Sequence, residues 1–390
     1  MAEQHKTLTF DSTQLSRMRE TIEADLGRGA YFGAVLSIKV RGETVIEQAF
    51  GSRAPGQQAL EVTDIFRVLS LTKLFTNILV LQCIGRGTLS FNTRVIDIIP
   101  EFLGRDRFRA AKKDKVTVAH LLNHTAGMPV TPTPLPYEQL GDLSAVIDAI
   151  CQMDAVATPG EQLIYSPAVN HALLGEIVRR VYKDKTFRET LQRELLDPLG
   201  LASTELGNVS GRDIVPLKAN FGSEAWLSAD DIEILNTVIN GSNELPWVGI
   251  TTSVADVMTL AEALRASLAG LPSSIVPQAV IDKATRNTTG EQPNDLFRRV
   301  AESKGWEIRP GYLGLGFPLA GEGTAPNMFG TLTSPRTFGA FGAGSSLVWV
   351  DPERELSFAC LTSGVIAEDE NFLRFQTLSD MAVAGIERSH

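Results

Sequence analysis

Strand-like segments at the two ends of the chain constrain the fold more than any other feature of the sequence. Near the N-terminus, residues 34–40 and 44–48 are rich in Val, Ile and Leu, and Arg41-Gly42-Glu43 between them is typical of a hairpin turn. Residues 346–350 and 356–361 repeat this pattern near the C-terminus. The segments between are mostly helical, so the order is not that of alternating βαβ units. The sequence therefore predicts an α+β fold, with one antiparallel sheet built from both chain ends and flanked by helices.

A mainly helical region is inserted between the strands. Apolar residues at helical spacing predict helices over residues 12–28, 74–83, 118–122, 143–153, 169–181, 187–196, 254–268 and 372–386. The length of 390 residues suits one large domain or two interlocked ones. We expect a sheet domain of residues 1–75 and 245–390, a mainly helical domain of residues 76–244, and the active site between them.

Charge and cysteine usage exclude several classes of partner. The net charge of −10 argues against nucleic acid and against an anionic membrane surface. No apolar run reaches the length of a membrane span, and the N-terminal residues show no secretory pattern. Cys83, Cys151 and Cys360 are odd in number and far apart, which favours free thiols in a reducing compartment. These features predict a cytoplasmic protein, either a monomer or a homo-oligomer.

The tetrapeptide Ser70-Leu71-Thr72-Lys73 is the strongest chemical signal. A serine hydroxyl is a poor nucleophile until a base takes its proton. If Ser70 begins a helix, Lys73 lies one turn later on the same face, and its amine can reach the hydroxyl. The helix N-terminus also directs backbone N–H groups at a developing oxyanion. Taken alone, the tetrapeptide equally fits a helix-capping serine with a solvated lysine.

The surroundings of this tetrapeptide decide between the two interpretations. They form an ordered series: Ala34–Val40; Phe66 to Thr76; Gly87 to Ser90 with Ile98 to Phe102; Val118 to Met128; Pro159-Gly160 ahead of Tyr165-Ser166 and Leu173-Leu174-Gly175; Gly249-Ile250 with Ser253 and Asp256; and Gly342-Ala343-Gly344 ahead of Trp349 to Pro352. Over nearly the whole chain this series resembles the class C β-lactamase-like family, which also holds carboxylesterases, DD-peptidases and acyltransferases. The resemblance implies a β-lactamase/transpeptidase-like fold, with Ser70 as nucleophile and Lys73 as its activating partner.

The resemblance also assigns roles to residues far from Ser70. Tyr165 takes the tyrosine position of the second motif, where a phenol near a lysine ammonium can exist partly as phenolate and accept the Ser70 proton. Tyr165 and Lys73 would titrate as a coupled pair, so the immediate base stays open. The backbone N–H groups of Ser70 and Ala343 would form the oxyanion hole.

Two departures from the family pattern bear on the substrate. The second motif often reads Tyr-x-Asn, but here Pro167 follows Tyr165-Ser166, and Asn170 is the candidate for the amide role. The third motif is usually Lys-Thr-Gly or His-x-Gly, but here it reads Ala340-Phe341-Gly342. No cation or imidazole stands there to bind a substrate carboxylate, which favours an uncharged acyl or ester group. Further candidates for the substrate cleft are Phe221, Trp226, Trp247, Tyr312, Phe341 and Gly342.

Other site types are disfavoured. His120 and His124 have the spacing of two helical zinc ligands, but no Glu lies beside His120 as HExxH requires, so we expect structural histidines, no metal and no cofactor. No G-x-S-x-G nucleophile elbow occurs. The sequence thus predicts a serine hydrolase that cleaves a small-molecule carboxylic ester through an acyl-enzyme. The alternatives are an acyltransferase of secondary metabolism, a β-lactamase or DD-peptidase, and a catalytically silent binding protein on the same scaffold.

Overall fold

The two ends of the chain meet in one five-stranded antiparallel sheet, as predicted. The structure is a computed structural model that describes residues 8–104, 112–221 and 228–388. The strand order is β3-β2-β10-β9-β8, and all the neighbouring strands are antiparallel. These strands are β2 (Gly33–Val40), β3 (Glu43–Gly51), β8 (Phe338–Gly342), β9 (Ser346–Asp351) and β10 (Leu356–Ser363). The α+β fold predicted from the sequence is therefore confirmed.

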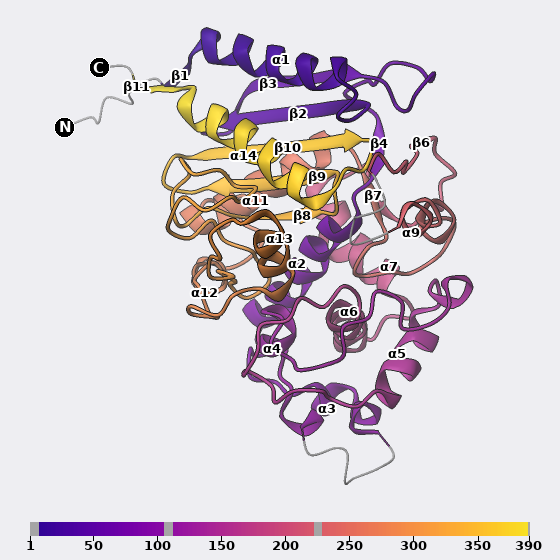
Figure 1. Cartoon of the computed structure of the whole chain (residues 1–390). Coiled ribbons are helices and arrows are strands. Elements are labelled where there is room, and N and C mark those ends of the chain that lie inside the picture. The colour runs from indigo at the N-terminus through magenta and orange to yellow at the C-terminus, as the bar shows by residue number, and fades with distance from the viewer. Residues whose placement is uncertain (1–7, 105–111, 222–227, 389–390) are drawn as a thin grey trace, which may run out of the picture.

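Helices cover both faces of this sheet (Figure 1). On one face, Leu36 and Trp349 share a core with α1 (Ser12–Gly27) and α14 (Glu368–Ala384). On the other face, Val35 and Val348 share a core with α11 (Val254–Ala269). Neighbouring residues of one strand point to opposite faces, so each strand contributes to both cores. Both faces of the sheet are buried, which explains the nearly continuous apolar runs in its strands.

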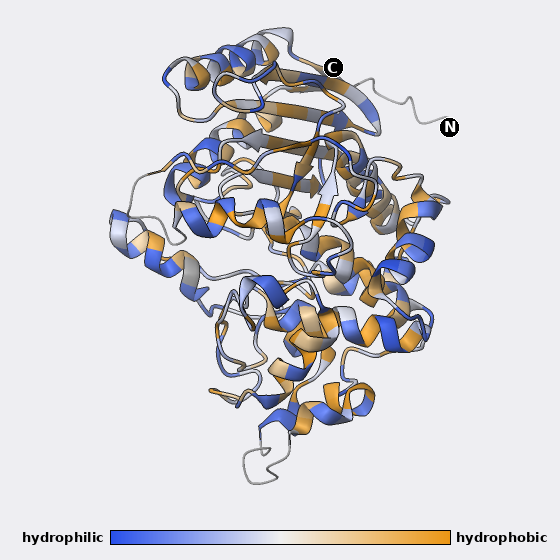
Figure 2. Cartoon of the chain, turned by 90° about the vertical axis from the view of Figure 1, so that its right-hand side faces the viewer, coloured by the Kyte–Doolittle hydropathy of each residue, from blue (hydrophilic) through white to orange (hydrophobic). Residues whose placement is uncertain are grey.

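The second core continues into the helical region through α2 (Thr72–Gly85). All of its residues from Thr72 to Cys83 are buried, as expected for a helix that is apolar on every side. The helices around and beyond it are α3 (Val95–Ile98), α4 (Val118–Leu122), α5 (Leu143–Gln152), α6 (Val169–Tyr182), α7 (Phe187–Leu191), α8 (Asp197–Leu199), α9 (Ala229–Glu233), α10 (Leu235–Val238), α12 (Gln278–Ala284) and α13 (Asp295–Lys304). Figure 2 shows hydrophobic residues along the strands of the large sheet and hydrophilic residues on the peripheral helices. Among the described helices, none combines the length and hydropathy that a membrane span requires.

A second, smaller sheet lies at the junction and holds the start of α2. Its order is β5-β7-β4-β6, with β5 (Glu205–Leu206), β7 (Ile250–Thr252), β4 (Ile65–Arg67) and β6 (Ile214–Val215). β4 pairs with β7 antiparallel and leads directly into the turn that carries Ser70. A third sheet pairs β1 (Leu8–Phe10) with β11 (Ile386–Arg388). The predicted division at residues 75 and 245 stays a prediction, because a single core joins α2 to the large sheet.

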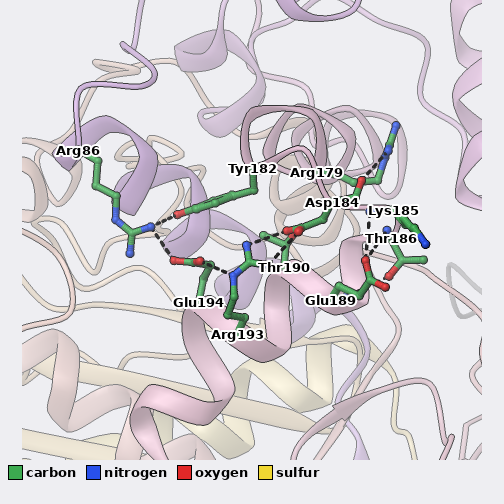
Figure 3. Close-up of polar contacts among 10 residues, drawn as sticks. All are labelled: Arg86, Arg179, Tyr182, Asp184, Lys185, Thr186, Glu189, Thr190, Arg193 and Glu194. Carbon is green, nitrogen blue, oxygen red and sulfur yellow. Dashed lines mark hydrogen bonds and ion pairs between the residues drawn. The ribbon is translucent and has the colours of Figure 1, made fainter.

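Two of the predicted helices differ from the structure. The segment 187–196 is not one α-helix, because α7 ends at Leu191 and a π-helical turn follows over Gln192–Leu196. In that turn Glu194 accepts hydrogen bonds from Arg86, at the end of α2, and from Arg193 (Figure 3). The terminal helix predicted over residues 372–386 begins four residues earlier and ends at Ala384. The remaining helices agree with prediction to within about two residues at their ends, which is the usual uncertainty of helix boundaries.

Candidate active site

Ser70 lies in a tight turn between β4 and α2. The turn is a single 3₁₀ segment, Leu69–Leu71, and Leu69 is buried with a φ of 49°. A left-handed conformation costs an L-residue about 1–2 kcal/mol, so the surroundings must hold the turn in place. They do so from β7, where the Ile250 carbonyl accepts from the Val68 N–H at 3.2 Å and the Ile250 N–H donates to Thr72 Oγ1 at 3.0 Å. The turn exposes Ser70 at the start of a buried helix.

The structure brings Ser70, Lys73 and Tyr165 into direct contact. Lys73 Nζ and the Tyr165 hydroxyl each lie 2.9 Å from Ser70 Oγ and donate to it. Lys73 Nζ also donates to the Trp247 carbonyl oxygen at 3.1 Å, and it lies 5.2 Å from the centre of the Tyr165 ring. Tyr165 reaches Ser70 from 95 residues away, in the segment that precedes α6. The serine hydroxyl therefore has an amine on one side and a phenol on the other.

Burial sets the protonation of this trio. It lowers the pKa of Lys73 from 10.5 to about 7, because the amine is enclosed and contacts only uncharged acceptors. Burial also raises the pKa of Tyr165 to about 12, against a smaller lowering effect of its bond to Ser70. Near neutral pH a large fraction of Lys73 is a free amine that can accept a proton, whereas Tyr165 stays a phenol. The sequence suggested a Tyr165 phenolate, but this environment favours the phenol.

The polar partner of Lys73 is a backbone carbonyl, that of Trp247, and not the amide of Asn170. Asn170 is buried in α6, where its Nδ2 donates to the Leu121 carbonyl at 3.2 Å and its N–H donates to Ser166 Oγ at 3.1 Å. These bonds join the start of α6 to α4. The structure thus keeps Asn170 away from Ser70 and gives it a role in positioning α6.

His124, at the end of α4, holds the Tyr165 segment in place by three contacts. Its carbonyl accepts from the Ile164 N–H and its Nδ1 accepts from the Ser166 N–H, each at 3.0 Å. Its ring lies against the Tyr165 ring, with 4.9 Å between the centroids. Burial and the nearby Lys73 lower the pKa of His124 to about 3, so it stays neutral and keeps Nδ1 as an acceptor. The sequence indicated a structural histidine here but gave no sign of its partner.

Two further polar residues near Lys73 were not recognised from the sequence. His171 Nε2 lies 2.9 Å from Asn77 Oδ1, and both side chains are buried. Burial lowers the pKa of His171 well below its usual value, and Lys73 and His124 add to this effect. Asn77 is on the same side of α2 as Lys73, one helical turn later, which is the one signal that points to it.

Two cavities meet at Ser70. The first, named here the aromatic cavity, holds about 830 Å³ of empty space, its opening to solvent included, and is lined by Leu69, Ser70, Pro132, Thr133, Tyr137, Leu140, Tyr165, Pro167, Asp231, Ile232, Leu235, Leu245, Trp247, Val248, Phe341, Ala343 and Glu368. The second, named the histidine cavity, holds about 570 Å³ on the same measure and is lined by Ser70, Lys73, Leu74, Asn77, Leu122, His124, Tyr165, His171, Asn294, Phe297, Leu313, Gly316, Phe317, Pro318, Ala340 and Phe341. Ser70, Tyr165 and Phe341 line both, so Ser70 stands at their boundary.

The edge strand β8 brings Ala343 to the same place. Ser346 Oγ donates to the Val68 carbonyl at 3.0 Å, and a Cβ on Gly342 would lie 2.2 Å from that carbonyl oxygen. Only glycine allows this close approach between β8 and the turn before Ser70. Ala343 follows directly and lines the aromatic cavity with Ser70. This placement fits the predicted use of both backbone N–H groups as an oxyanion hole.

Of the other residues predicted to line the substrate cleft, some line the cavities at Ser70 and some do not. Trp247 and Phe341 line the cavities at Ser70. Gly342 acts through its close approach to Val68, and Tyr312 packs beneath Arg309 and against Gly321, away from both cavities. Phe221 lies near the surface beside α14, and Trp226 falls outside the described residues.

The described part of the chain holds no group of three potential metal ligands. His120 Nδ1 accepts from the Thr117 N–H at the start of α4, and His124 Nδ1 from the Ser166 N–H. A neutral imidazole whose Nδ1 accepts a hydrogen bond carries its proton on Nε2, so neither ring nitrogen offers zinc a lone pair. This favours the structural role that the sequence predicted for both histidines.

Here a serine at the start of a helix and beside a sheet edge is hydrogen-bonded to a buried amine. This arrangement defines a serine hydrolase that uses lysine where other classes use histidine. The chain belongs to the β-lactamase family, since the family model described as "Beta-lactamase" matches residues 18–379. A protein of Salmonella agona (strain SL483) named "Putative D-alanyl-D-alanine carboxypeptidase" is 25% identical over 374 residues, covering 90% of this chain and 83% of its own length.

Solved structures show the same fold. A penicillin-binding protein homolog from Caulobacter crescentus has a TM-score of 0.76 at 22% identity, over 97% of this chain and 100% of that one. A family VIII carboxylesterase also has a TM-score of 0.76, at 19% identity, over 96% of this chain and 100% of that one. These likenesses establish the β-lactamase/transpeptidase-like architecture, whereas the substrate must be inferred from this chain's own site.

Proposed function

We propose that the protein hydrolyses carboxylic esters through an acyl-enzyme on Ser70. Neutral Lys73 accepts the Ser70 proton as Oγ attacks the ester carbonyl, and the N–H groups of Ser70 and Ala343 stabilise the oxyanion. The phenol of Tyr165 donates a proton to the departing alkoxide and is reprotonated from Lys73. Water then attacks the acyl-enzyme and gives a proton to Lys73, which passes it to Ser70 Oγ as the acid is released.

The main support for this proposal is that the described cavity walls hold no cation apart from Lys73. Ala340 is buried where the family usually has Lys or His. The described walls of the aromatic cavity contain two carboxyl groups, those of Asp231 and Glu368, and no Lys or Arg. A substrate carboxylate, such as those of β-lactams and peptidoglycan stems, would find no counter-ion and two repelling groups there. An ester needs none of these contacts.

The test is turnover of short p-nitrophenyl esters by the wild type and by Ser70→Ala. We expect the wild type to release p-nitrophenol with saturable kinetics, and the variant to lose at least about a thousandfold in kcat. Equal rates in the two proteins would contradict the proposal. Since the Ser70 side chain accepts no helix-capping hydrogen bond, a matched melting curve should show the variant folded.

The name of the Salmonella relative supports one competing function, a DD-carboxypeptidase. A fluorescent penicillin distinguishes the two, because a DD-carboxypeptidase is acylated at its nucleophile and the esterase proposed here is not. Covalent labelling that Ser70→Ala abolishes would favour the peptidase. Acyl transfer, the other function left open by the sequence, is read from the products when an alcohol competes with water.

A further inference from the structure

The walls of the aromatic cavity combine aromatic faces with two carboxyl groups. Glu368 is the first residue of α14 and Asp231 lies in α9, and both line the cavity that holds Ser70. Tyr137, Tyr165, Trp247 and Phe341 supply the aromatic side chains. A site that binds carboxylates presents positive charge, whereas the described walls of this cavity present carboxyl groups and aromatic rings.

Asp231 is held as an anion by uncharged donors. Its side chain accepts from the Tyr137 hydroxyl at 2.8 Å and from Ser228 Oγ at 2.7 Å and the Ser228 N–H at 3.0 Å. These hydrogen bonds lower its pKa, with that to Ser228 the largest cause. Because its described partners bring no positive charge, the negative charge of Asp231 remains to act on the cavity.

Glu368 is half-buried and poised between its charged and neutral forms. Burial raises its pKa to about 7, while Asn371, the Gly344 backbone and Arg374 act in the opposite direction. A positive charge in the cavity would favour the carboxylate and would be stabilised by it in turn. Aromatic faces attract cations as well, most strongly when the cation is desolvated.

We propose that the aromatic cavity binds a positively charged part of the substrate, a protonated amine or a quaternary ammonium group, between Glu368 and Asp231. This inference rests on the proposed ester hydrolysis and specifies its substrate class. The net charge of the chain, −10, would also attract such a substrate from solution.

Binding to the inactive Ser70→Ala protein tests this inference without turnover. One pair of ligands is butyrylthiocholine and its neutral isostere, S-(3,3-dimethylbutyl) thiobutyrate, with the charge in the leaving group. A second pair places a trimethylammonio group, or a neutral tert-butyl group, at the end of the acyl chain of an ethyl ester. Isothermal titration calorimetry should give roughly tenfold tighter binding for the charged member of at least one pair.

Three variants in the Ser70→Ala background identify the groups responsible. Glu368→Gln and Asp231→Asn preserve size and remove the charge, and each should reduce the preference for charge at least threefold. Glu370→Gln is the matched control, since Glu370 is exposed on the same helix and does not line the cavity. It should leave the preference unchanged.

Equal binding of charged and neutral ligands in both pairs would overturn the inference, as would a preference that neither carboxyl variant alters. Turnover of the neutral esters by the wild type tests the proposed function separately. The two hypotheses can therefore fail independently.

Discussion

At the scale of single residues, the chemistry depends on how completely Lys73 is buried. Its amine contacts Ser70 Oγ and the Trp247 carbonyl, and no carboxylate appears among the causes of its pKa shift. A lysine paired with a carboxylate would keep its proton at neutral pH and could not act as a base. The same enclosure keeps Tyr165 protonated, so in the proposed mechanism Lys73 acts as the base and Tyr165 as the acid.

We expect kcat/KM for a neutral ester to rise with pH near 7, the pKa of Lys73, and to rise in the same way in Glu368→Gln, which removes the other cavity group with a pKa of about 7. The deprotonated amine is the active form, so activity is low below this value and reaches a plateau above it. No fall from Tyr165 should appear below about pH 10, because its pKa is about 12. Initial rates between pH 5 and pH 9.5 measure this, and a profile that is flat across pH 7 would contradict it.

At this scale the sequence predicted which side chains meet at Ser70 better than it predicted their protonation. The spacing of Ser70 and Lys73 follows from helix geometry, and Tyr165 followed from family resemblance. Neither source reveals how deeply an amine is buried, and so the phenolate was expected where a phenol is found. Glu368 escaped notice because a single glutamate near the C-terminus carries no local pattern, and only the fold brings it to Ser70.

At the scale of elements, the end of α4 positions the segment that carries Tyr165. His124 has a φ of 58°, which L-residues rarely adopt, and its carbonyl, Nδ1 and ring each contact residues 164–166. Such strain persists where the surrounding contacts compensate for it. The strained residue here fixes the Tyr165 phenol 2.9 Å from Ser70 Oγ.

His124→Asn and His124→Phe separate this positioning role from packing. Asn tolerates positive φ and can accept the Ser166 N–H, whereas Phe keeps the ring but loses the acceptor. We expect kcat to fall by roughly 10- to 100-fold in His124→Phe with a smaller change in KM, and the Asn variant to retain most activity. Steady-state kinetics with one ester decide it, and the idea fails if both variants lose kcat equally while remaining folded.

The strands missed from the sequence share a cause. β8 reads Phe-Gly-Ala-Phe-Gly and has little β-propensity of its own, but its glycines allow close approach to Val68 and to β9. The short strands of the second sheet are two or three residues long, too short for a detectable alternation. Tertiary contacts define these elements, whereas the long strands and helices follow from local periodicity.

At the scale of the whole molecule, the site is assembled from segments distant in sequence. The large sheet joins residues 33–51 to residues 338–363, and one core links it to α2 and α6. The strand-like segments at the two ends of the chain were sufficient to predict the large sheet. The number of subunits and the cytoplasmic location stay predictions, although the three cysteines are free and buried, as expected.

Burying an ionisable amine in this assembly should reduce its stability. The folded pKa of Lys73, about 7, lies below its ordinary value of 10.5, so folding releases a proton between these values and the cost of the buried charge is fullest at or below pH 7. We expect Lys73→Met to raise the free energy of unfolding by about 2 kcal/mol at pH 6 while abolishing activity. Urea denaturation at pH 6 and pH 9 measures this, and the gain should shrink at the higher pH. A variant less stable than the wild type at pH 6 would refute the cost assigned to this lysine.

The most direct test of the account is to trap the acyl group on the protein. Wild type mixed with excess p-nitrophenyl ester at pH 7 and quenched in acid should carry one acyl adduct by intact mass spectrometry. Fragmentation should place it on Ser70, in the tryptic peptide that ends at Lys73. Ser70→Ala should remain unmodified. An adduct on another residue, or ester turnover by Ser70→Ala at the wild-type rate, would contradict the assignment of Ser70 as the nucleophile.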